Sequence, residues 1–426
     1  MIVGILLSAA MPAYGIIDRT PLPKNLDANC EKTQKKVRYA HTHRHRVTRD
    51  GQVRTIRHYH RHGHVVCKNN DGKWVTLKHI HKHRPSNAPK ANYRPNNSAP
   101  LVTKATGHQL GIQYHGLWSN MTDSRRAAVL NKIKASGAKW VRLDMSWAMI
   151  QPNRGSYDMG WGVPKVDTVV REANQRGLKI LATFWLTPSW ANGGRGERTA
   201  PSNPQDYADA LAWAAKRWDG KIQAWEVWNE PNSGDFLNGA NPVQYSNLLC
   251  AAYRKMKNSG VKQRVVYGGT MYNDSDWIKQ TYQAGAINCY DIMATHPYTA
   301  PADDSPGQKS DGTQWSFRHV QAVRNLEKRY GKSRPMWLTE YGWSAHRNDG
   351  SEANWEKGVT EAQQAEYATQ VLDLMKTDYP YIKKAFYYEA TQDNSSSTHL
   401  NGYGMLTYNL QERPVYKAFQ RYLGVN

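Results

Sequence analysis

The strongest constraint on the fold is an alternation, from about residue 101 to the C-terminus, of short apolar runs with longer amphipathic stretches. Eight apolar runs have the length of strands, at residues 109–114, 140–144, 179–184, 222–228, 264–268, 292–296, 336–340 and 384–388. Stretches with a helical pattern separate many of them, at residues 124–136, 163–175, 204–218, 242–259, 318–330 and 361–376. This repeat is typical of a (β/α)8 barrel, so we predict an α/β fold of that kind for residues 101–426.

Two glutamates lie at the ends of two of these runs. Glu230 lies in WEVWNEPN (residues 225–232), at the fourth run, and Glu340 lies in MWLTEYGW (residues 336–343), at the seventh. In a parallel barrel the carboxyl ends of the strands meet at one face, where catalytic groups lie. Two carboxylates about 5–5.5 Å apart allow one to attack a sugar while the other protonates the leaving oxygen. We therefore predict a retaining glycoside hydrolase, rather than two glutamates that only form structural salt bridges.

Polar and aromatic residues at the other strand ends form the predicted substrate-binding set: Arg142, Asp144, Trp147, Trp185, Trp190, Asn229, His296, Tyr298, Trp343 and Tyr388. Trp and Tyr rings have a flat apolar face and a polar edge, which suits stacking on sugars. Asn229 is expected to hydrogen-bond the sugar 2-hydroxyl, and Tyr298 to orient the nucleophile. We expect no cofactor and no metal in the barrel.

Several motifs together carry a resemblance to known enzymes: WVRLDMSW (140–147), QP and GSY (151–152 and 155–157), WNEPN (228–232), ATHPY (294–298), LTEYGW (338–343), YGML (403–406) and RPVY (413–416). On these motifs, residues 108–426 resemble the clan A retaining glycoside hydrolases, in particular family 39-like enzymes such as bacterial exopolysaccharide endoglycosidases of the Psl-cleaving type. The resemblance implies that Glu230 is the acid/base and Glu340 the nucleophile. Many clan members carry a Trp at the eighth strand, where this chain has FYYE (386–389).

The first hundred residues have a different character. They hold 19 Lys and Arg against 5 Asp and Glu, and ten of the 16 His lie in residues 37–84. Asp-Gly pairs at 50–51 and 71–72 suggest short hairpins. We interpret residues 15–84 as a basic His-rich module that contacts an anionic polymer or cell envelope, with no specific nucleic acid as partner. A metal site and a solvated low-complexity segment are the alternatives, and residues 85–100 read as a linker.

The N-terminus and the cysteines suggest export. Residues 1–14 hold an apolar run typical of a signal peptide, although the usual basic start is missing and a short anchor is the alternative. The four cysteines fall into two pairs, Cys30 with Cys67 and Cys250 with Cys289, which favours two disulfides over buried thiols. We expect a secreted, periplasmic or cell-surface location.

Three hypotheses of function follow. The leading one is an endo-acting retaining glycosidase that cleaves a bacterial surface or extracellular polysaccharide, with an exo-acting xylosidase- or iduronidase-like enzyme as its nearest rival. The second is a non-catalytic carbohydrate- or polyanion-binding barrel, against which both intact glutamates argue. The third is a His-rich metal- or polyanion-binding protein for which the barrel is secondary.

Overall fold

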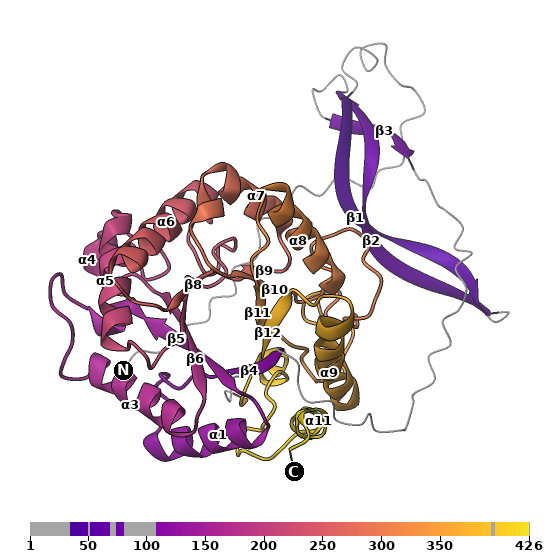
Figure 1. Cartoon of the computed structure of the whole chain (residues 1–426). Helices are drawn as coiled ribbons and strands as arrows, with labels where there is room; N and C mark the ends of the chain where they lie inside the picture. Colours follow the sequence, from indigo (N-terminus) through magenta and orange to yellow (C-terminus); the bar gives the residue numbers. More distant parts are fainter. Residues whose placement is uncertain (1–34, 50–51, 69–73, 81–107, 393–396, 426) are drawn as a thin grey trace. The chain divides into compact units, whose positions relative to one another are not determined.

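The computed structural model describes residues 35–49, 52–68, 74–80, 108–392 and 397–425 (Figure 1). The chain forms two compact units, residues 1–99 and 100–426, and each is described by itself. The expected signal peptide, the linker at 85–100 and Cys30 lie outside the described residues, so they stay predictions. Within the described ranges, no helix is long and apolar enough to cross a membrane.

The described part of the first unit is a three-stranded antiparallel sheet. It consists of β1 (Lys35–Arg49), β2 (Gln52–Lys68) and β3 (Trp74–Ile80), with β2 in the middle. The backbone register places His41 opposite His60 and His43 opposite His58. The strands flank the two Asp-Gly sequences at which we expected hairpin turns, and the turns themselves lie outside the described residues.

The second unit is built on parallel strands: β4 (Gln109–Gln113), β5 (Trp140–Ser146), β6 (Lys179–Trp185), β7 (Ala224–Val227), β8 (Arg264–Tyr267), β9 (Thr270–Met271), β10 (Met293–His296), β11 (Met336–Tyr341) and β12 (Ile382–Tyr387). Their order in the sheet is β8-β7-β6-β5-β4-β12-β11-β10-β9. Two glycines separate β8 from β9, and the two together serve as one barrel strand. Each of the eight predicted strands overlaps an observed one, and the predicted barrel fold is confirmed.

The ends of this sheet meet next to β10. Val266 in β8 forms a parallel bridge with Ile292, and the backbone nitrogen of Tyr267 donates to the carbonyl of Ile292 at 3.0 Å. These contacts close the sheet into a barrel, so that all strand ends face one opening.

A helix of the outer layer follows each barrel strand (Figure 1): α1 (Asp123–Ala135), α3 (Gly162–Gln175), α5 (Pro204–Arg217), α6 (Pro242–Asn258), α7 (Ser275–Gln283), α8 (Val320–Arg329), α9 (Glu361–Thr377) and α11 (Pro414–Leu423). Short helices lie in the loops: α2 (Trp147–Ile150), α4 (Ser189–Asn192), α10 (Thr398–Asn401), η2 (Ala286–Asn288) and η3 (Phe317–His319). The sequence analysis did not identify α7 and α11, which have only nine and ten residues. Length alone does not explain this, because α8 also has ten residues and was predicted.

Local sequence explains where the longer helices begin. Asn241 caps α6 because its side chain accepts hydrogen bonds from the next turn, and Pro242 takes the first helical position, where no backbone donor is needed. Thr360 and Gln363 form a capping box at the start of α9.

Two apolar cores lie on the two sides of the strands. The inner one fills the barrel: Trp140, Leu181, Ala224, Val266, Ile292, Ala294, Trp337 and Phe386. The larger one lies between the strands and the helices. Side chains alternate along a strand, so Arg142 and Glu226, two positions after Trp140 and Ala224, also point into the barrel. The polar site therefore begins directly next to the inner core.

The predicted pairing of Cys250 with Cys289 is confirmed. Cys250 in α6 and Cys289 after η2 form a disulfide with their Cα atoms 4.8 Å apart. The bond joins α6 to the segment that leads into β10.

Candidate active site

A bulge at the end of β11 sets the direction of Glu340. Between the pairs that Leu338 and Tyr341 make with β12, β11 carries one residue more than its neighbour. A bulge of this kind re-aims side chains. Thr339 and Glu340 both make hydrogen bonds inside the barrel, although they are adjacent, whereas the Tyr341 hydroxyl bonds to a carbonyl of α9. Strict alternation would have turned Glu340 away from the barrel axis.

A sharp turn after β7 sets the position of Glu230. Trp228 and Glu230 have φ values of +73° and +43°, in the left-handed region that few non-glycine residues adopt. The Trp228 indole donates to the carbonyl of Phe236 at 3.0 Å, and the Glu230 backbone nitrogen donates to the carbonyl of Gly269 at 3.0 Å. These bonds hold the turn and point the Glu230 carboxyl group toward β10.

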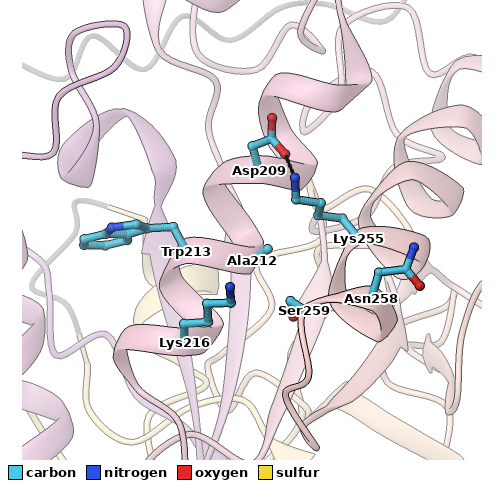
Figure 2. Close-up of a pocket in the computed structure, with 7 residues that line it drawn as sticks. All are labelled: Asp209, Ala212, Trp213, Lys216, Lys255, Asn258 and Ser259. Atoms are coloured by element: carbon cyan, nitrogen blue, oxygen red, sulfur yellow. Dashed lines mark ion pairs between the residues drawn. The ribbon is translucent and has the colours of Figure 1, made fainter.

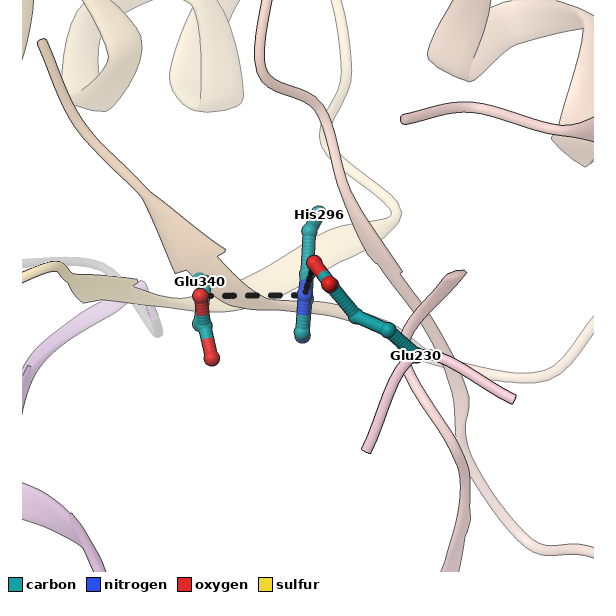
Figure 3. A group of neighbouring side chains, drawn as sticks. All are labelled: Glu230, His296 and Glu340. Atoms are coloured by element: carbon teal, nitrogen blue, oxygen red, sulfur yellow. Dashed lines mark hydrogen bonds and ion pairs between the residues drawn. The ribbon is translucent and has the colours of Figure 1, made fainter. Parts of the chain in front are cut away.

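Glu230, His296 and Glu340 meet at the carboxyl ends of the strands (Figure 3). His296 Nδ1 lies 2.8 Å from Glu230 Oε1 and 3.8 Å from Glu340 Oε2. One oxygen of each carboxyl group and this nitrogen all lie within 4.8 Å of one another. A spacing this short agrees with the geometry of retaining enzymes and is too short for a water to attack between the two groups.

Glycine is required next to His296. A Cβ atom at Gly269 would lie 2.3 Å from His296 Nε2, so no side chain fits there. His296 Nε2 also lies 3.0 Å from the Thr339 hydroxyl. Both ring nitrogens of His296 are thus in contact with protein atoms, and the buried ring holds Glu230 in place rather than facing a ligand.

Arg142 connects the two glutamates to the barrel interior. Its guanidinium donates to Glu226 Oε2 (2.7 Å), Glu340 Oε1 (2.6 Å), Asn229 Oδ1 (2.7 Å) and Gln113 Oε1 (2.8 Å). The side chain is fully buried. The predicted substrate contact of Arg142 is therefore corrected: this residue positions the groups around it.

The two glutamates differ in their electrostatic surroundings. Burial raises the pKa of Glu340 to about 7, although the charge of Arg142 and a hydrogen bond from Tyr298 favour its carboxylate. Burial and then the charge of Glu340 raise the pKa of Glu230 well above its ordinary value. Above a pH of about 7 the pair therefore holds one proton, and that proton is on Glu230.

Burial, and then the charge of Arg142, lower the pKa of His296 well below its ordinary value. His296 is consequently a neutral imidazole at physiological pH. It contacts Glu230 without adding a positive charge that would draw the proton off this glutamate.

A second group, which we call the His115 cluster, consists of His115, Asp144 and Glu389. His115 Nδ1 lies 2.9 Å from Asp144 Oδ2, and His115 Nε2 lies 3.1 Å from Glu389 Oε2. Burial alone would lower the pKa of His115, but its bonds to both carboxylates outweigh that and raise the pKa to about 10. His115 is therefore a cation between two carboxylates. The ring of Trp118 stacks on it at 3.8 Å.

The remaining predicted residues divide into exposed and buried ones. Trp185, Trp190 and Tyr388 are half-buried and keep part of their rings accessible. Trp147 has no exposed surface and Trp343 is 2% exposed. Their indoles donate to Gln151 and to the carbonyl of Asp304 inside the protein. The expectation that these two rings contact sugar is corrected, because neither has a free face.

One predicted contact exists within the protein, and a second predicted residue is held by a different one. Tyr298 donates to Glu340 Oε2 at 2.8 Å, the orienting bond that we expected. Asn229 accepts a bond from Arg142 at its side-chain oxygen, which fixes the orientation of the amide; its contact with the sugar 2-hydroxyl stays a prediction.

The sequence analysis gave no role to His115, Trp118 or Glu389. His115 follows β4 and Glu389 follows β12, which are neighbouring strands in the barrel. A histidine at the end of an apolar run is a signal that could have been used. Trp118 lies in the following loop, and nothing in its local sequence indicates that it covers His115.

A cavity of about 570 Å³ lies elsewhere, between α5 and α6 (Figure 2). Its lining residues are Asp209, Ala212, Trp213, Lys216, Lys255, Asn258 and Ser259. Lys255 pairs with Asp209 at 2.6 Å across it. It contains none of the carboxylates described above, so the barrel opening is the better candidate for catalysis.

Comparison with protein families gives one match over most of the barrel. The model described as Cellulase (glycosyl hydrolase family 5) matches residues 100–378. Among curated proteins, endo-1,4-beta-xylanase 1 of Gibberella zeae is 32% identical over 118 residues, which are 26% of this chain and 31% of the xylanase. Endo-1,4-beta-xylanase A of Fusarium oxysporum f. sp. lycopersici is 30% identical over 131 residues, 29% of this chain and 38% of that protein. The chain thus spans well under half the length of either.

Solved structures share the fold at low identity. A family 39 glycoside hydrolase from Bacteroides cellulosilyticus WH2 has a TM-score of 0.59 and 18% identity, covering 92% of this chain and 80% of that one. A GH5_18 enzyme from Streptomyces cattleya in complex with GlcNAc has a TM-score of 0.58 and 19% identity, covering 75% and 80%. A monomeric beta-xylosidase from Caulobacter crescentus CB15 has a TM-score of 0.57 and 17% identity, covering 75% and 68%.

Proposed function

The chain belongs to the cellulase family, glycosyl hydrolase family 5, and is a retaining glycoside hydrolase; we propose that Glu230 is its acid/base, that Glu340 is its nucleophile, and that it cuts polysaccharide chains internally. Families 5 and 39 both belong to clan A, so the resemblance to clan A is confirmed, whereas specificity of the Psl-cleaving type stays a prediction.

The observation that supports these roles is the difference in protonation between two carboxyl groups in contact with one histidine. Glu340, whose pKa is about 7, is held by Arg142 and Tyr298 as the carboxylate that attacks the anomeric carbon. The bond to the leaving oxygen breaks as Glu230 gives that oxygen its proton. Glu230 then takes a proton from water, which attacks the same carbon and releases Glu340.

Neighbouring residues support the transition state. The Asn229 amide nitrogen is placed to donate to the sugar 2-hydroxyl next to Glu340, a contact that strengthens as charge develops on the ring. Trp118, Trp185, Trp190 and Tyr388 expose ring surface, and flat rings suit successive sugars of a chain.

Internal cleavage is favoured over exo action by the names of the relatives, and a bacterial surface or extracellular polysaccharide as the substrate stays a prediction. Both curated relatives are endo-1,4-beta-xylanases, and the matching family model is that of cellulases. Exo action is the second candidate, because two solved neighbours are beta-xylosidases and a third is an exo-beta-1,4-mannosidase.

Incubation with a panel of bacterial exopolysaccharides, xylan, glucan and arabinan, followed by product sizing, tests this proposal. Endo action gives an early drop in polymer length with a spread of oligosaccharides, whereas release of monosaccharide alone contradicts it. NMR of the first product should show the anomer of the substrate.

We propose that residues 15–84 retain the enzyme on an anionic polymer or cell envelope outside the cell. The charge of this segment supports the proposal, since 19 Lys and Arg stand against 5 Asp and Glu in the first hundred residues. The apolar start of the chain and the Cys250–Cys289 disulfide favour export.

A pull-down on an anionic polymer, comparing the full chain with a form that begins at Leu101, tests this role. Retention of the full chain should weaken with salt, and strengthen below about pH 6.5 as histidines gain charge. Retention that ignores salt but is abolished by a chelator would support the metal-binding alternative instead.

A further inference from the structure

A continuous row of aromatic side chains runs along one side of the barrel opening, beside Glu340. Its members lie in the loops that follow β4, β12 and β11, which are neighbouring strands of the sheet. Each ring contacts the next one, and the ring centroids are 3.8, 5.8, 5.5, 5.2 and 5.6 Å apart along the row. We call this set the ring row, and its members are, in order, Trp118, His115, Tyr388, Tyr403, His399 and Trp355.

The middle of the ring row adjoins the candidate catalytic centre. Tyr298 donates to Glu340 Oε2 at 2.8 Å, and its ring lies 6.1 Å from that of Tyr403. Tyr403 is 8% exposed, whereas the two ends of the row are indoles with 38% and 48% of their surface exposed. Two rings of the row lie between Tyr298 and Trp355. Trp355 is therefore placed for a part of the substrate other than the sugar that Glu340 attacks.

The backbone on both sides of Trp355 is held in place. The carbonyl of Asn354 accepts a bond at 2.7 Å from a backbone nitrogen in the loop after β10, and the carbonyl of Glu356 accepts one at 3.1 Å from His399 Nδ1. Burial lowers the pKa of His399, so the ring is neutral, and its Nε2 accepts from the Tyr403 hydroxyl at 3.4 Å. His399 thus links the position of Trp355 to that of Tyr403. An indole on such a fixed backbone loses little freedom when a ligand packs on it.

Exposure of an aromatic ring does not by itself indicate a binding site, because single exposed apolar side chains are common on proteins. Trp161, before α3, is such a residue. It is 59% exposed, and within the described ranges its ring contacts Lys165 but no other aromatic ring. Trp355 differs from Trp161 because its ring belongs to a connected set that reaches the residue bonded to Glu340.

We propose that Trp355 binds a sugar of the substrate chain that lies beyond the two sugars joined by the cleaved bond, and that His399 positions Trp355. The ligand is a chain of pyranoses with equatorial hydroxyls. Such a sugar carries apolar C–H groups on its faces, and one of these faces packs on the exposed indole. The inference rests on the proposed role of Glu340, because the ring row is placed relative to that residue.

The test measures kcat and KM of the full chain on soluble oligosaccharides of increasing length, cut from the polysaccharide that the panel identifies, and on an aryl glycoside of its single sugar. We expect Trp355→Ala to raise KM about tenfold on the long oligosaccharides, the scale of one lost aromatic contact. Because this contact binds ground state and transition state alike, kcat should stay within about twofold. The aryl glycoside does not reach Trp355, so its KM should not rise. Trp355→Tyr, which keeps a flat ring, should restore part of the loss.

The matched control is Trp161→Ala, which makes the same exchange at the more exposed indole. It should change neither constant at any substrate length. His399→Phe keeps a ring but loses the bond to the carbonyl of Glu356, so it should raise KM on the same long oligosaccharides by a smaller factor than Trp355→Ala. An equal loss on the aryl glycoside would show that His399 is only structural and contradict its positioning role.

A Trp355→Ala variant that matches the wild type at every length, or one that loses as much on the aryl glycoside as on the long chains, would overturn the proposal. An equal length-dependent loss in Trp161→Ala would overturn the role of the ring row. Glu340→Gln, measured beside them, separates these outcomes from failure of the proposed function. If Glu340→Gln stays active and Trp355→Ala shows the length-dependent loss, the sugar site at Trp355 is supported and the nucleophile is wrong. If Glu340→Gln is inactive and Trp355→Ala shows no such loss, only the sugar site is contradicted.

Discussion

The barrel contains two histidines that each contact two carboxyl groups, and they hold opposite charges. His296 lies between Glu230 and Glu340 and has a pKa well below its ordinary value, whereas His115 lies between Asp144 and Glu389 and has a pKa of about 10. Both rings are buried. The same three functional groups thus produce a neutral imidazole at one place and an imidazolium at the other.

The cause of the difference is the neighbouring cation. Arg142 already bonds Glu340 and repels a second positive charge at His296, so the proton of that group stays on a carboxyl oxygen. In the His115 cluster the ring itself bonds both carboxylates and supplies the positive charge. Burial lowers the pKa of both rings; the charge of Arg142 lowers that of His296 further, whereas the bonds to Asp144 and Glu389 raise that of His115.

Replacement of Glu340, the carboxylate next to His296, should have the largest effect on activity. We expect Glu340→Gln to lower kcat by about 10⁴-fold or more, because the covalent step loses its nucleophile. Initial rates on the best polysaccharide of the panel measure this. The matched control is Glu366→Gln, which makes the same exchange at an exposed position of α9 and should leave kcat unchanged. A Glu340→Gln variant whose kcat lies within tenfold of the wild-type value would contradict the role of Glu340 as nucleophile.

Removal of the proton donor should have a smaller effect that depends on the substrate. We expect Glu230→Gln to lower kcat about 10²- to 10⁴-fold on polysaccharide, the usual contribution of general acid catalysis. An aryl glycoside with a very acidic phenol needs no protonation, so the formation of its glycosyl-enzyme should be nearly unaffected. Burst kinetics with such phenols measure this step. An equal loss for good and poor leaving groups would argue against an acid role.

The two histidines should differ in what they contribute to stability. His115→Gln removes the cation that joins Asp144 and Glu389 and should lower the free energy of unfolding by about 3 kcal/mol. His296→Gln exchanges one neutral hydrogen-bonding group for another and should cost about 1 kcal/mol. Denaturant unfolding of both variants measures the difference.

The pH dependence of the stability difference between wild type and His115→Gln is a control. The folded pKa of His115 lies above its ordinary value, so its contribution is complete below about pH 6.5 and disappears as the pH rises through about 10. The gap between wild type and His115→Gln should therefore close at alkaline pH.

The smallest effect is on the pH profile of activity. Glu340 must be ionised to attack, so kcat/KM should fall about tenfold per pH unit below a pKa of about 7. At alkaline pH, kcat/KM should fall again as Glu230 loses the proton that it gives to the leaving oxygen. Asp144→Asn removes a charge that raises the pKa of Glu340, so it should move the acidic limb to lower pH. A limb that stays in place would show that the two groups are not coupled.

The sequence predicted those features that depend on hydrophobic periodicity and on the residues at the ends of strands. The eight strands, the placement of Glu230 and Glu340 and the contact of Tyr298 with Glu340 all follow from short local patterns. The bulge at Thr339 and Glu340 could not be predicted, since it depends on pairing with β12. Trp147 looked like a binding residue because it follows β5, but it begins α2 and packs inward.

The sequence analysis was also limited by contacts between residues that lie far apart in the sequence. His115 and Glu389 lie near opposite ends of the barrel sequence and meet only when β4 pairs with β12 and closes the barrel. Arg142 was expected to contact substrate, because a sequence does not reveal that four protein groups already occupy its donors.

The backbone conformation at Glu230 has a consequence for the evolution of this chain. A φ of +43° favours glycine or asparagine, and a side chain such as glutamate costs about 1–2 kcal/mol there. A buried acid adds to this cost. Selection for thermostability alone should therefore replace Glu230 early with glycine or asparagine, whereas selection for activity keeps it. Sorting one mutant library by both criteria should give opposite outcomes at this codon, because folding and turnover compete for the same residue.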